Sequence, residues 1–145
     1  MKQRMTLFIL LSVCSSGFAA TSVSALQKDW AITNYELQGD EQVQSFEQLI
    51  ETAASAVAME PSNAELLIWK AIIESTYAGK ASSLTALRLV KAARADLEAA
   101  MDIDPMALDG SAYTSLGALY YQVPSWPLAF GSSKKARKLL EKAIE

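Results

Sequence analysis

Apolar side chains recur every three or four residues along most of this chain, and prolines separate the segments that carry the pattern. In an α-helix this spacing gathers the apolar side chains on one face, where they can be buried together. The clearest segment covers residues 42–60, and its apolar positions are Val43, Phe46, Leu49, Ile50, Ala53, Ala56 and Val57. No segment shows the strict alternation that is typical of a half-buried strand. The pattern therefore predicts an all-α fold.

The pattern and its breaks predict five or six helices. The expected ranges are about 26–37, 42–60, 64–78, 82–103, 109–122 and 132–145. The sequence QGDE at residues 38–41 indicates a turn between the first two. Pro61 and Pro105 each end a helix, and Asn63 can cap the next one, because its side-chain oxygen can accept a free backbone amide. Residues 20–41 are thus expected to be a lead-in and a short helix, and residues 42–145 the main helical domain.

The first 20 residues, MKQRMTLFILLSVCSSGFAA, have the layout of a secretory signal peptide. Lys2 and Arg4 supply the positive start, and an apolar run too short to span a bilayer follows. We expect residues 1–19 to form the signal peptide, with cleavage between residues 19 and 25, after Ala19 or after Ala25. The expected location is the periplasm. A short N-terminal membrane anchor is the alternative interpretation.

Cys14 allows a second interpretation of this region. The sequence LSVC resembles a bacterial lipobox, in which the cysteine is acylated and becomes the new N-terminus. A lipobox prefers Gly, Ala or Ser before the cysteine, whereas Val13 stands there, so Cys14 can also be an ordinary apolar residue of the signal core. We therefore expect membrane association only if Cys14 is lipidated.

Two residue types that carry much of enzyme chemistry are missing from the mature chain. The sequence has no His, and its single Cys falls within the predicted signal peptide. Thiol catalysis, imidazole acid–base catalysis and Cys/His metal sites are thereby excluded. Asp102 and Asp104 could in principle act as an acid–base pair, but both lie at a helix end beside Pro105, in an expected exposed turn. We predict neither enzymatic activity nor a cofactor.

The net negative charge of the chain argues against nucleic acid as a partner. Without residues 1–19 the chain has 11 basic and 16 acidic residues, which disfavours nucleic acid binding. A basic cluster lies on the last expected helix, at Lys134, Lys135, Arg137, Lys138 and Lys142. An acidic cluster surrounds the turn at Pro105, at Asp96, Glu98, Asp102, Asp104 and Asp109. Each cluster can dock a charged partner or simply be the solvated face of a helix.

The last two expected helices carry the spacing of a known repeat. The first half of the tetratricopeptide pattern is matched by Tyr113, Leu116, Gly117 and Tyr120, and the second half by Ala136, Leu140 and Ala143. The upstream pair repeats the second half at Ala93, Leu97 and Ala100, before Pro105. Pro61 and Pro105 are 44 residues apart, however, whereas the repeat has about 34 residues. The extra residues fall around positions 79–88.

Small side chains at four positions of the expected hairpins would allow the close helix packing that the repeat requires. Gly117 and Ala71 would let the two helices of each hairpin approach closely, and Ala136 and Ala93 would occupy the matching contacts on the second helices. Each hairpin then has an apolar face that only a neighbouring hairpin can cover, so such units stack into a curved array. A generic helical bundle is the alternative.

With these motifs the chain resembles bacterial periplasmic tetratricopeptide-repeat proteins. The segments LGALYYQVPSWPLAFGSSKKARKLLEKAIE and NAELLIWKAI are similar to the T-component-like helical proteins associated with TRAP transporters. The resemblance covers about residues 45–145 and implies TPR-like stacked antiparallel helical hairpins, an α-solenoid. It also implies an exported scaffold that binds a partner protein or a small apolar ligand. The chain ends before the Leu-x-Pro usual after such a helix, which leaves a truncated C-terminal end open.

The segment VPSWPLAFG interrupts the last hairpin. Pro124 and Pro127 fix their own φ angles and bias their neighbours toward extended backbone, which predicts an ordered excursion over residues 123–131. It carries two large apolar side chains, Trp126 and Phe130. One interpretation is that they fold back and plug the end of the hairpin. The other is that they line the mouth of a pocket or a partner site.

A candidate binding groove follows from the repeat register, because the first helix of each pair forms the concave surface of such arrays. We expect a groove that suits an extended peptide or a chain-like ligand. The candidate residues are Ile68, Trp69, Ile72, Thr114, Tyr121, Gln122, Trp126 and Phe130. The predicted function is an exported scaffold for protein–protein interaction in the periplasm, with a protein or peptide partner. The alternative is a TRAP-type transporter accessory that binds a small apolar ligand.

Overall fold

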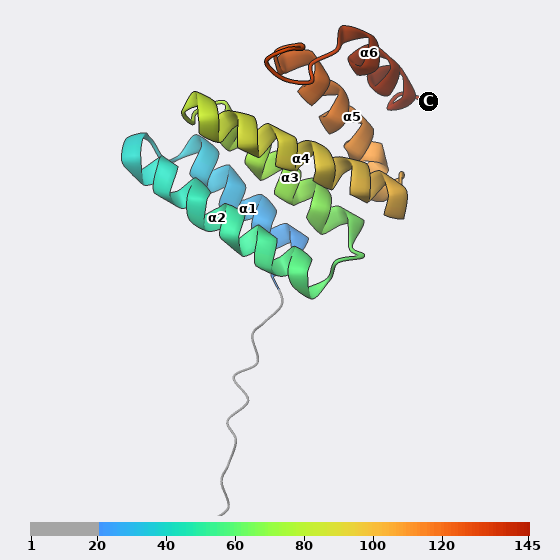
Figure 1. Cartoon of the computed structure of the whole chain (residues 1–145). Coiled ribbons are helices and arrows are strands. Elements are labelled where there is room, and N and C mark those ends of the chain that lie inside the picture. Colours follow the sequence, from blue (N-terminus) through green and yellow to red (C-terminus); the bar gives the residue numbers. More distant parts are fainter. Residues whose placement is uncertain (1–20) are drawn as a thin grey trace, which may run out of the picture.

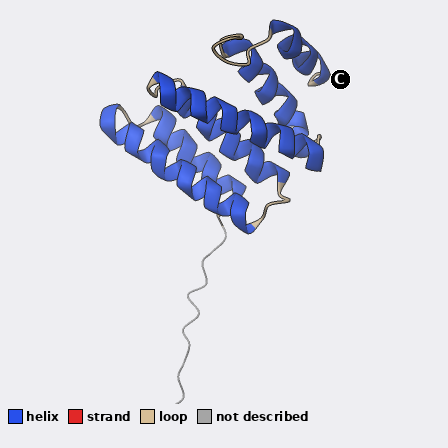
Figure 2. Cartoon of the chain, in the orientation of Figure 1, coloured by secondary structure: helices blue, strands red, loops and turns tan. Residues whose placement is uncertain are grey.

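The computed structural model describes residues 21–145, which fold into six α-helices (Figure 1). Their bounds are α1 (Val23–Tyr35), α2 (Gly39–Met59), α3 (Ala64–Ala78), α4 (Ser83–Ile103), α5 (Ala107–Gln122) and α6 (Ser133–Lys142). Successive helices pack antiparallel, and each contacts the next in order along the chain. No strand forms within residues 21–145 (Figure 2), where Ser125 and Gly131 make a single isolated bridge. The prediction of an all-α fold with five or six helices is confirmed.

Capping side chains explain where three helices begin. The Asn63 side chain accepts a hydrogen bond from the Leu66 amide at 3.2 Å, and α3 has the predicted range. The Ser132 hydroxyl accepts one from the Lys135 amide at 3.3 Å and starts α6. At α1 the cap is Ser22, so the helix begins at Val23, three residues before the predicted start. Such oxygens satisfy amides that have no partner within the helix.

Two further boundaries differ from the predictions. Helix α2 begins at Gly39, inside the segment 38–41 that was predicted to be a turn. Gly39 has φ +59°, a conformation that costs glycine little, so the reversal after α1 is completed within the first residue of α2. Helix α6 ends at Lys142 rather than at residue 145.

The start of α5 is a left-handed turn that the sequence pattern did not indicate. Leu108, Asp109 and Gly110 have φ angles of 50°, 55° and 75°. Only glycine adopts this region freely, and the conformation costs other residues roughly 1–2 kcal/mol each. The turn lies directly after the predicted stop at Pro105, where the chain reverses between α4 and α5.

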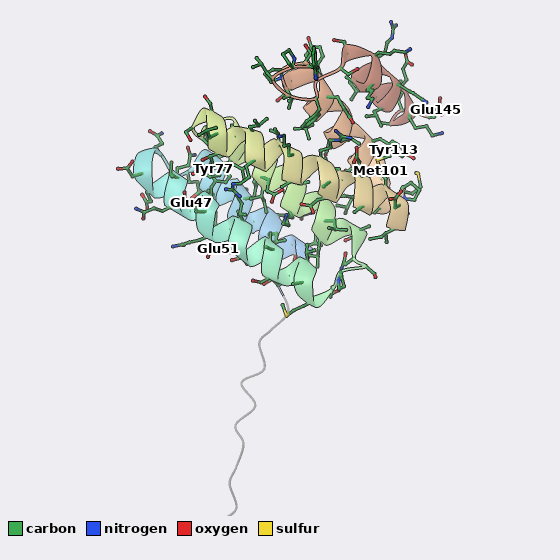
Figure 3. All side chains as sticks on the ribbon, viewed as in Figure 1. Glu47, Glu51, Tyr77, Met101, Tyr113 and Glu145 are labelled. Atoms are coloured by element: carbon green, nitrogen blue, oxygen red, sulfur yellow. The ribbon has the colours of Figure 1, made fainter. Side chains whose placement is uncertain are left out.

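Helix α3 is the centre of the fold, because it contributes to both hydrophobic clusters. One cluster joins α1, α2, α3 and the start of α4, and includes Leu26, Phe46, Leu49, Ile73 and Leu89. The other joins α3, α4, α5 and α6, and includes Ile68, Ala93, Leu97, Leu116 and Ala136. Nine of the 15 residues of α3 are buried, because apolar side chains nearly surround this helix. The Tyr77 hydroxyl also donates to the Glu47 carboxylate at 3.1 Å, which ties α3 to α2 (Figure 3).

The predicted close contact within the last hairpin is confirmed. Gly117 on α5 and Ala136 on α6 are both buried. A Cβ atom added at Gly117 would lie 2.8 Å from Leu140 Cγ and 3.3 Å from the Ala136 carbonyl oxygen. These distances are shorter than van der Waals contact, so only glycine allows α5 and α6 to pack this closely. The two small residues of the upstream hairpin, Ala71 and Ala93, are also fully buried.

None of the helices within residues 21–145 has both the length and the apolar character needed to cross a bilayer. The predicted signal peptide and Cys14 lie outside the described residues.

Candidate binding cleft

An open cleft of about 790 Å³ lies among the described residues. Its walls are the C-terminal half of α3, the N-terminal half of α4, the C-terminal half of α5 and the loop after α5. The lining residues are Ile72, Ser75, Thr76, Ala78, Gly79, Ser83, Leu84, Ala86, Leu87, Val90, Ser115, Ala118, Leu119, Gln122, Val123, Pro124, Leu128 and Ala129. This volume lies within the range typical of ligand sites, about 300–1,000 Å³.

No charged side chain lines the cleft. Its polar groups are four hydroxyls and one amide, on Ser75, Thr76, Ser83, Ser115 and Gln122, and the remaining side chains are apolar. Two leucines stand at its rim with most of their surface in water, Leu84 at 85% and Leu128 at 74% exposure. Water penalises such exposed apolar surface, so an occupant that covered both leucines would gain affinity. The chemistry of the cleft suits an uncharged, mainly apolar occupant with a few hydrogen-bonding groups.

One wall of the cleft comes from the segment around residues 79–88, which the sequence interpretation counted as extra to the expected repeat. The extra residues around positions 79–88 form the turn after α3 and the first turns of α4, and five of them line the cleft: Gly79, Ser83, Leu84, Ala86 and Leu87. The 44-residue spacing between Pro61 and Pro105 was therefore the available signal for this wall. The sequence interpretation assigned those residues no role.

The α3 wall is fixed by hydrogen bonds from inside the fold. The Thr76 hydroxyl donates to the Ile72 carbonyl at 2.7 Å and accepts from the Trp30 indole at 3.1 Å. Trp30 in turn packs edge to face on Trp69, with 5.8 Å between the ring centroids. Helix α1 therefore supports the cleft from behind without lining it.

The loop over residues 123–132 is ordered, as its two prolines predicted. The Gly131 amide donates to the Pro124 carbonyl, and the Ser132 amide donates to the Tyr120 carbonyl, each at 2.9 Å. Gly131 lies so close to the backbone of Val123 that an added Cβ atom would overlap the Val123 carbonyl. The loop therefore holds one shape and closes one side of the cleft through Pro124 and its neighbours.

The two large side chains of the loop take different positions. Phe130 folds back and packs edge to face on Tyr120, with 5.5 Å between the ring centroids, in agreement with the plug interpretation. Trp126 points into solvent and is 86% exposed, so for this residue the plug interpretation is wrong. Two prolines beside Trp126 restrict the backbone rotation that would be needed to bring the indole back onto the hairpin.

A smaller pocket of about 420 Å³ adjoins the cleft at Leu128 and Ala129. Its floor is α4, where the Arg94 guanidinium lies 5.5 Å from the Tyr120 ring centroid and 5.1 Å from that of Phe130. Arg94 also donates to the Glu98 carboxylate at 2.7 Å, and this hydrogen bond raises the pKa of Arg94. Since Arg94 is already paired, this pocket is a weaker candidate for binding an anion.

The structure places two of the eight predicted groove residues in the cleft: Ile72 and Gln122. Phe130 lines the smaller pocket. Ile68 is buried in the core, and Trp69 packs on Trp30. The other three, Thr114, Tyr121 and Trp126, are exposed and line neither cavity. The register assumed a groove along the first helices alone, whereas the cleft lies between three helices and a loop.

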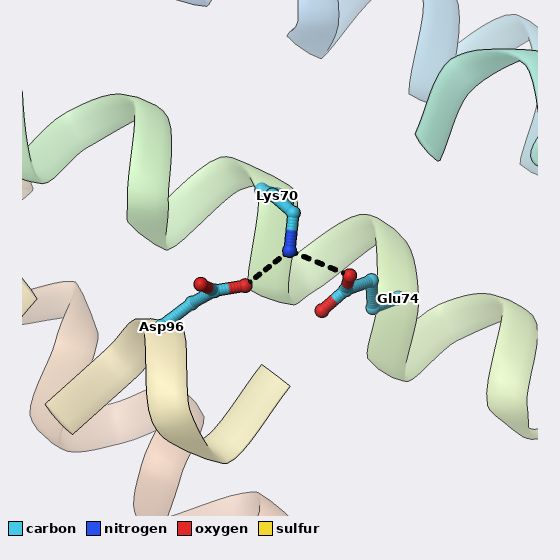
Figure 4. Close-up of polar contacts among 3 residues, drawn as sticks. All are labelled: Lys70, Glu74 and Asp96. Carbon is cyan, nitrogen blue, oxygen red and sulfur yellow. Dashed lines mark hydrogen bonds and ion pairs between the residues drawn. The ribbon is translucent and has the colours of Figure 1, made fainter. Parts of the chain in front are cut away.

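An ion cluster of a buried glutamate, Glu74, and two part-buried partners, Lys70 and Asp96, joins α3 to α4 (Figure 4). The Lys70 ammonium donates to Glu74 Oε1 at 2.7 Å and to Asp96 Oδ2 at 2.6 Å. Burial lowers the pKa of Lys70, but the hydrogen bonds to Asp96 and Glu74 outweigh that effect and leave the pKa above its ordinary value. Glu74 is 3% exposed, and its second oxygen, Oε2, has no hydrogen-bond partner among the described residues.

Burial of this carboxylate makes its protonation depend on folding. Desolvation raises the pKa of Glu74 from 4.5 to about 6, against the opposing effect of Lys70. The folded protein therefore binds this proton more tightly than the unfolded chain does. The resulting contribution to stability is full below about pH 4.5 and is lost as the pH rises through about 6. It amounts to about 2 kcal/mol.

No group of three or more metal-ligating side chains within residues 21–145 is placed to hold an ion. Comparison of the sequence with models of known protein families gave no match. Comparison with curated proteins gave no match either.

Proposed function

We propose that this chain is an exported helical scaffold that binds a partner protein through the cleft between α3, α4, α5 and the 123–132 loop. In this proposal the helices are TPR-like hairpins, as the resemblance implies. Support comes from the buried small residues of the two hairpins and from the antiparallel order of the helices. Repeat scaffolds of this kind present extended surfaces to other proteins.

The observation that carries the proposal is the absence of charge from a cleft of about 790 Å³ with two exposed leucines at its rim. An apolar segment of a partner protein would cover Leu84 and Leu128. Its backbone amides and carbonyls would find the hydroxyls and the amide of the cleft. Such grooves commonly take an amphipathic helix or an extended peptide.

The second candidate is a small apolar ligand, in the manner of an accessory protein of a TRAP-type transporter. The volume of the cleft favours it, because it falls within the range of small-molecule sites. Both candidates use the same walls, so an experiment has to separate a protein from a small molecule as the occupant.

Export to the periplasm belongs to the same proposal, and α1 favours one cleavage site over the other. Cleavage after Ala19 would keep all of α1 and its cap, Ser22. Cleavage after Ala25 would remove that cap and the first turn of α1, and would leave the buried Leu26 at the new N-terminus. We therefore propose cleavage after Ala19.

Photo-crosslinking tests the cleft. A benzophenone amino acid replaces Ser83 in the cleft in one variant and Ser55 on the exposed face of α2 in the control. The expected result is a discrete protein adduct from position 83 in the producing cells and none from position 55. Equal adducts from both positions, or none from either, would refute the scaffold function.

Native mass spectrometry of the purified chain separates the two candidates. A bound small molecule that dissociates on collisional activation would favour the ligand candidate. A chain free of small molecules, together with the protein adduct at position 83, would favour the scaffold.

A further inference from the structure

A rigid loop exposes two large apolar side chains directly before the most basic helix of the described chain. Trp126 and Leu128 have most of their surface in water. The other two tryptophans, Trp30 and Trp69, are part-buried and pack on each other. Trp126 lines neither cavity, so the cleft does not explain its exposure.

The loop is built to keep this shape. The Leu128 amide donates to the Ser125 carbonyl at 3.2 Å, and the hydrogen bonds of Gly131 and Ser132 close the base of the loop. Gly131 packs against the Val123 carbonyl, where a larger residue would not fit. The exposure of Trp126 is thus a property of an ordered loop.

The helix directly after the loop carries a net positive charge. Helix α6 (Ser133–Lys142) has five basic residues and one acidic residue. Lys134 and Lys138 are exposed, and neither forms an ion pair with the described carboxylates. The Lys135 ammonium lies 5.1 Å from the Tyr120 ring centroid, next to the base of the loop. The apolar tip and the basic helix therefore belong to one end of the molecule.

We propose that this loop–α6 surface, formed by Trp126, Lys134, Lys135 and Lys138, docks on an anionic lipid bilayer. Trp126 enters the interfacial layer, and the lysines contact lipid phosphates. Tryptophan favours the membrane interface, and each basic residue near an anionic bilayer contributes about 1 kcal/mol.

Two observations favour a lipid surface over a protein partner at this surface. Trp126 projects outward from a loop and does not line a concave pocket. The helix that follows the loop has five basic residues and one acidic residue, and this excess of positive charge matches an anionic surface. The proposal does not rest on the function of the cleft or on lipidation of Cys14.

Quenching of Trp126 fluorescence by brominated lipid tests this docking directly. The full chain is titrated with phosphatidylcholine–phosphatidylglycerol vesicles whose acyl chains carry bromine, and with brominated phosphatidylcholine vesicles alone. Bromine quenches only tryptophans at the depth of the acyl chains, so attachment through another part of the chain leaves Trp126 bright. The signal of Trp126 is obtained as the difference between the wild type and Trp126→Phe.

The expected result is a blue shift and quenching of Trp126 on the anionic vesicles alone, weakened by added salt because the charges are screened. Lys138→Gln is expected to weaken the interaction about fivefold. The matched control, Lys28→Gln on the exposed face of α1, is expected to leave it unchanged. The proposal is overturned if Trp126 stays unquenched, if neutral vesicles quench it equally, or if both lysine variants have the same effect.

Discussion

Gly117→Ala is the substitution that most directly tests the close contact between α5 and α6. The new Cβ atom would lie 2.8 Å from Leu140 Cγ and 2.9 Å from Leu140 Cδ2. Overpacking of this kind costs about 2 kcal/mol, while alanine is about 1 kcal/mol more favourable than glycine inside a helix. The net expectation is a loss of about 1 kcal/mol in the free energy of unfolding.

A double-mutant cycle isolates the contact from the helix propensity. In a Leu140→Ala background the clash with the Leu140 side chain disappears, and only the 3.3 Å contact with the Ala136 carbonyl oxygen remains. Gly117→Ala should then no longer destabilise the protein, because the gain in helix propensity offsets what is left of the overpacking. The expected coupling energy is about 2 kcal/mol. Urea unfolding of the four proteins, followed by circular dichroism, measures it. A coupling below about 0.5 kcal/mol would contradict the packing described for this hairpin.

Three further substitutions test other parts of the fold. The wild type should lose about 2 kcal/mol of stability between pH 4.5 and 7 as Glu74 ionises, and Glu74→Gln should not show this loss. Urea unfolding of both proteins at several pH values measures it. The same pH dependence in both proteins would contradict the raised pKa of the buried carboxylate. Gly131→Ala should lower the free energy of unfolding by about 2–4 kcal/mol, because the new Cβ atom would overlap the Val123 backbone, which cannot easily move. A melting temperature equal to that of the wild type would contradict the loop geometry. Asp109→Gly should stabilise the protein by about 1 kcal/mol, because glycine adopts the left-handed conformation of this position without the steric cost that Asp109 bears. The same thermal melts measure this, and a lower melting temperature would contradict the left-handed conformation at residue 109.

The sequence was sufficient to predict those features that depend on a residue and its near neighbours in the chain. Helix α3 has the predicted range because Asn63 caps it and the preceding Pro61 ends α2 nearby. Gly117 and Ala136 were assigned to a close helix contact from their spacing, and they form one. The order of the 123–132 loop followed from Pro124 and Pro127, whose φ angles are fixed whatever the surrounding fold.

The cleft could not be derived in the same way, because tertiary packing creates it. The length of α4 and the path of the loop decide that Leu87 and Ala129 line one cavity, although they are far apart in sequence. Ile68 and Tyr121 also show that tertiary packing, and not the sequence pattern, decides which residues line the cleft. The helical pattern identified both as surface candidates, but Ile68 is covered by the hairpin that packs on α3, and Tyr121 faces away from the cleft. The left-handed turn at Leu108 had no signal in its residue type.

Filling the cleft is the most direct test of its role. Ala118 lines the cleft on α5 and is part-exposed, so Ala118→Trp should occupy the space without disturbing the core. The measurement is the yield of the photo-adduct from position 83 with and without this substitution, at equal helix content by circular dichroism. We predict that the adduct is lost when the cleft is filled. An adduct of undiminished yield would show that the partner binds elsewhere.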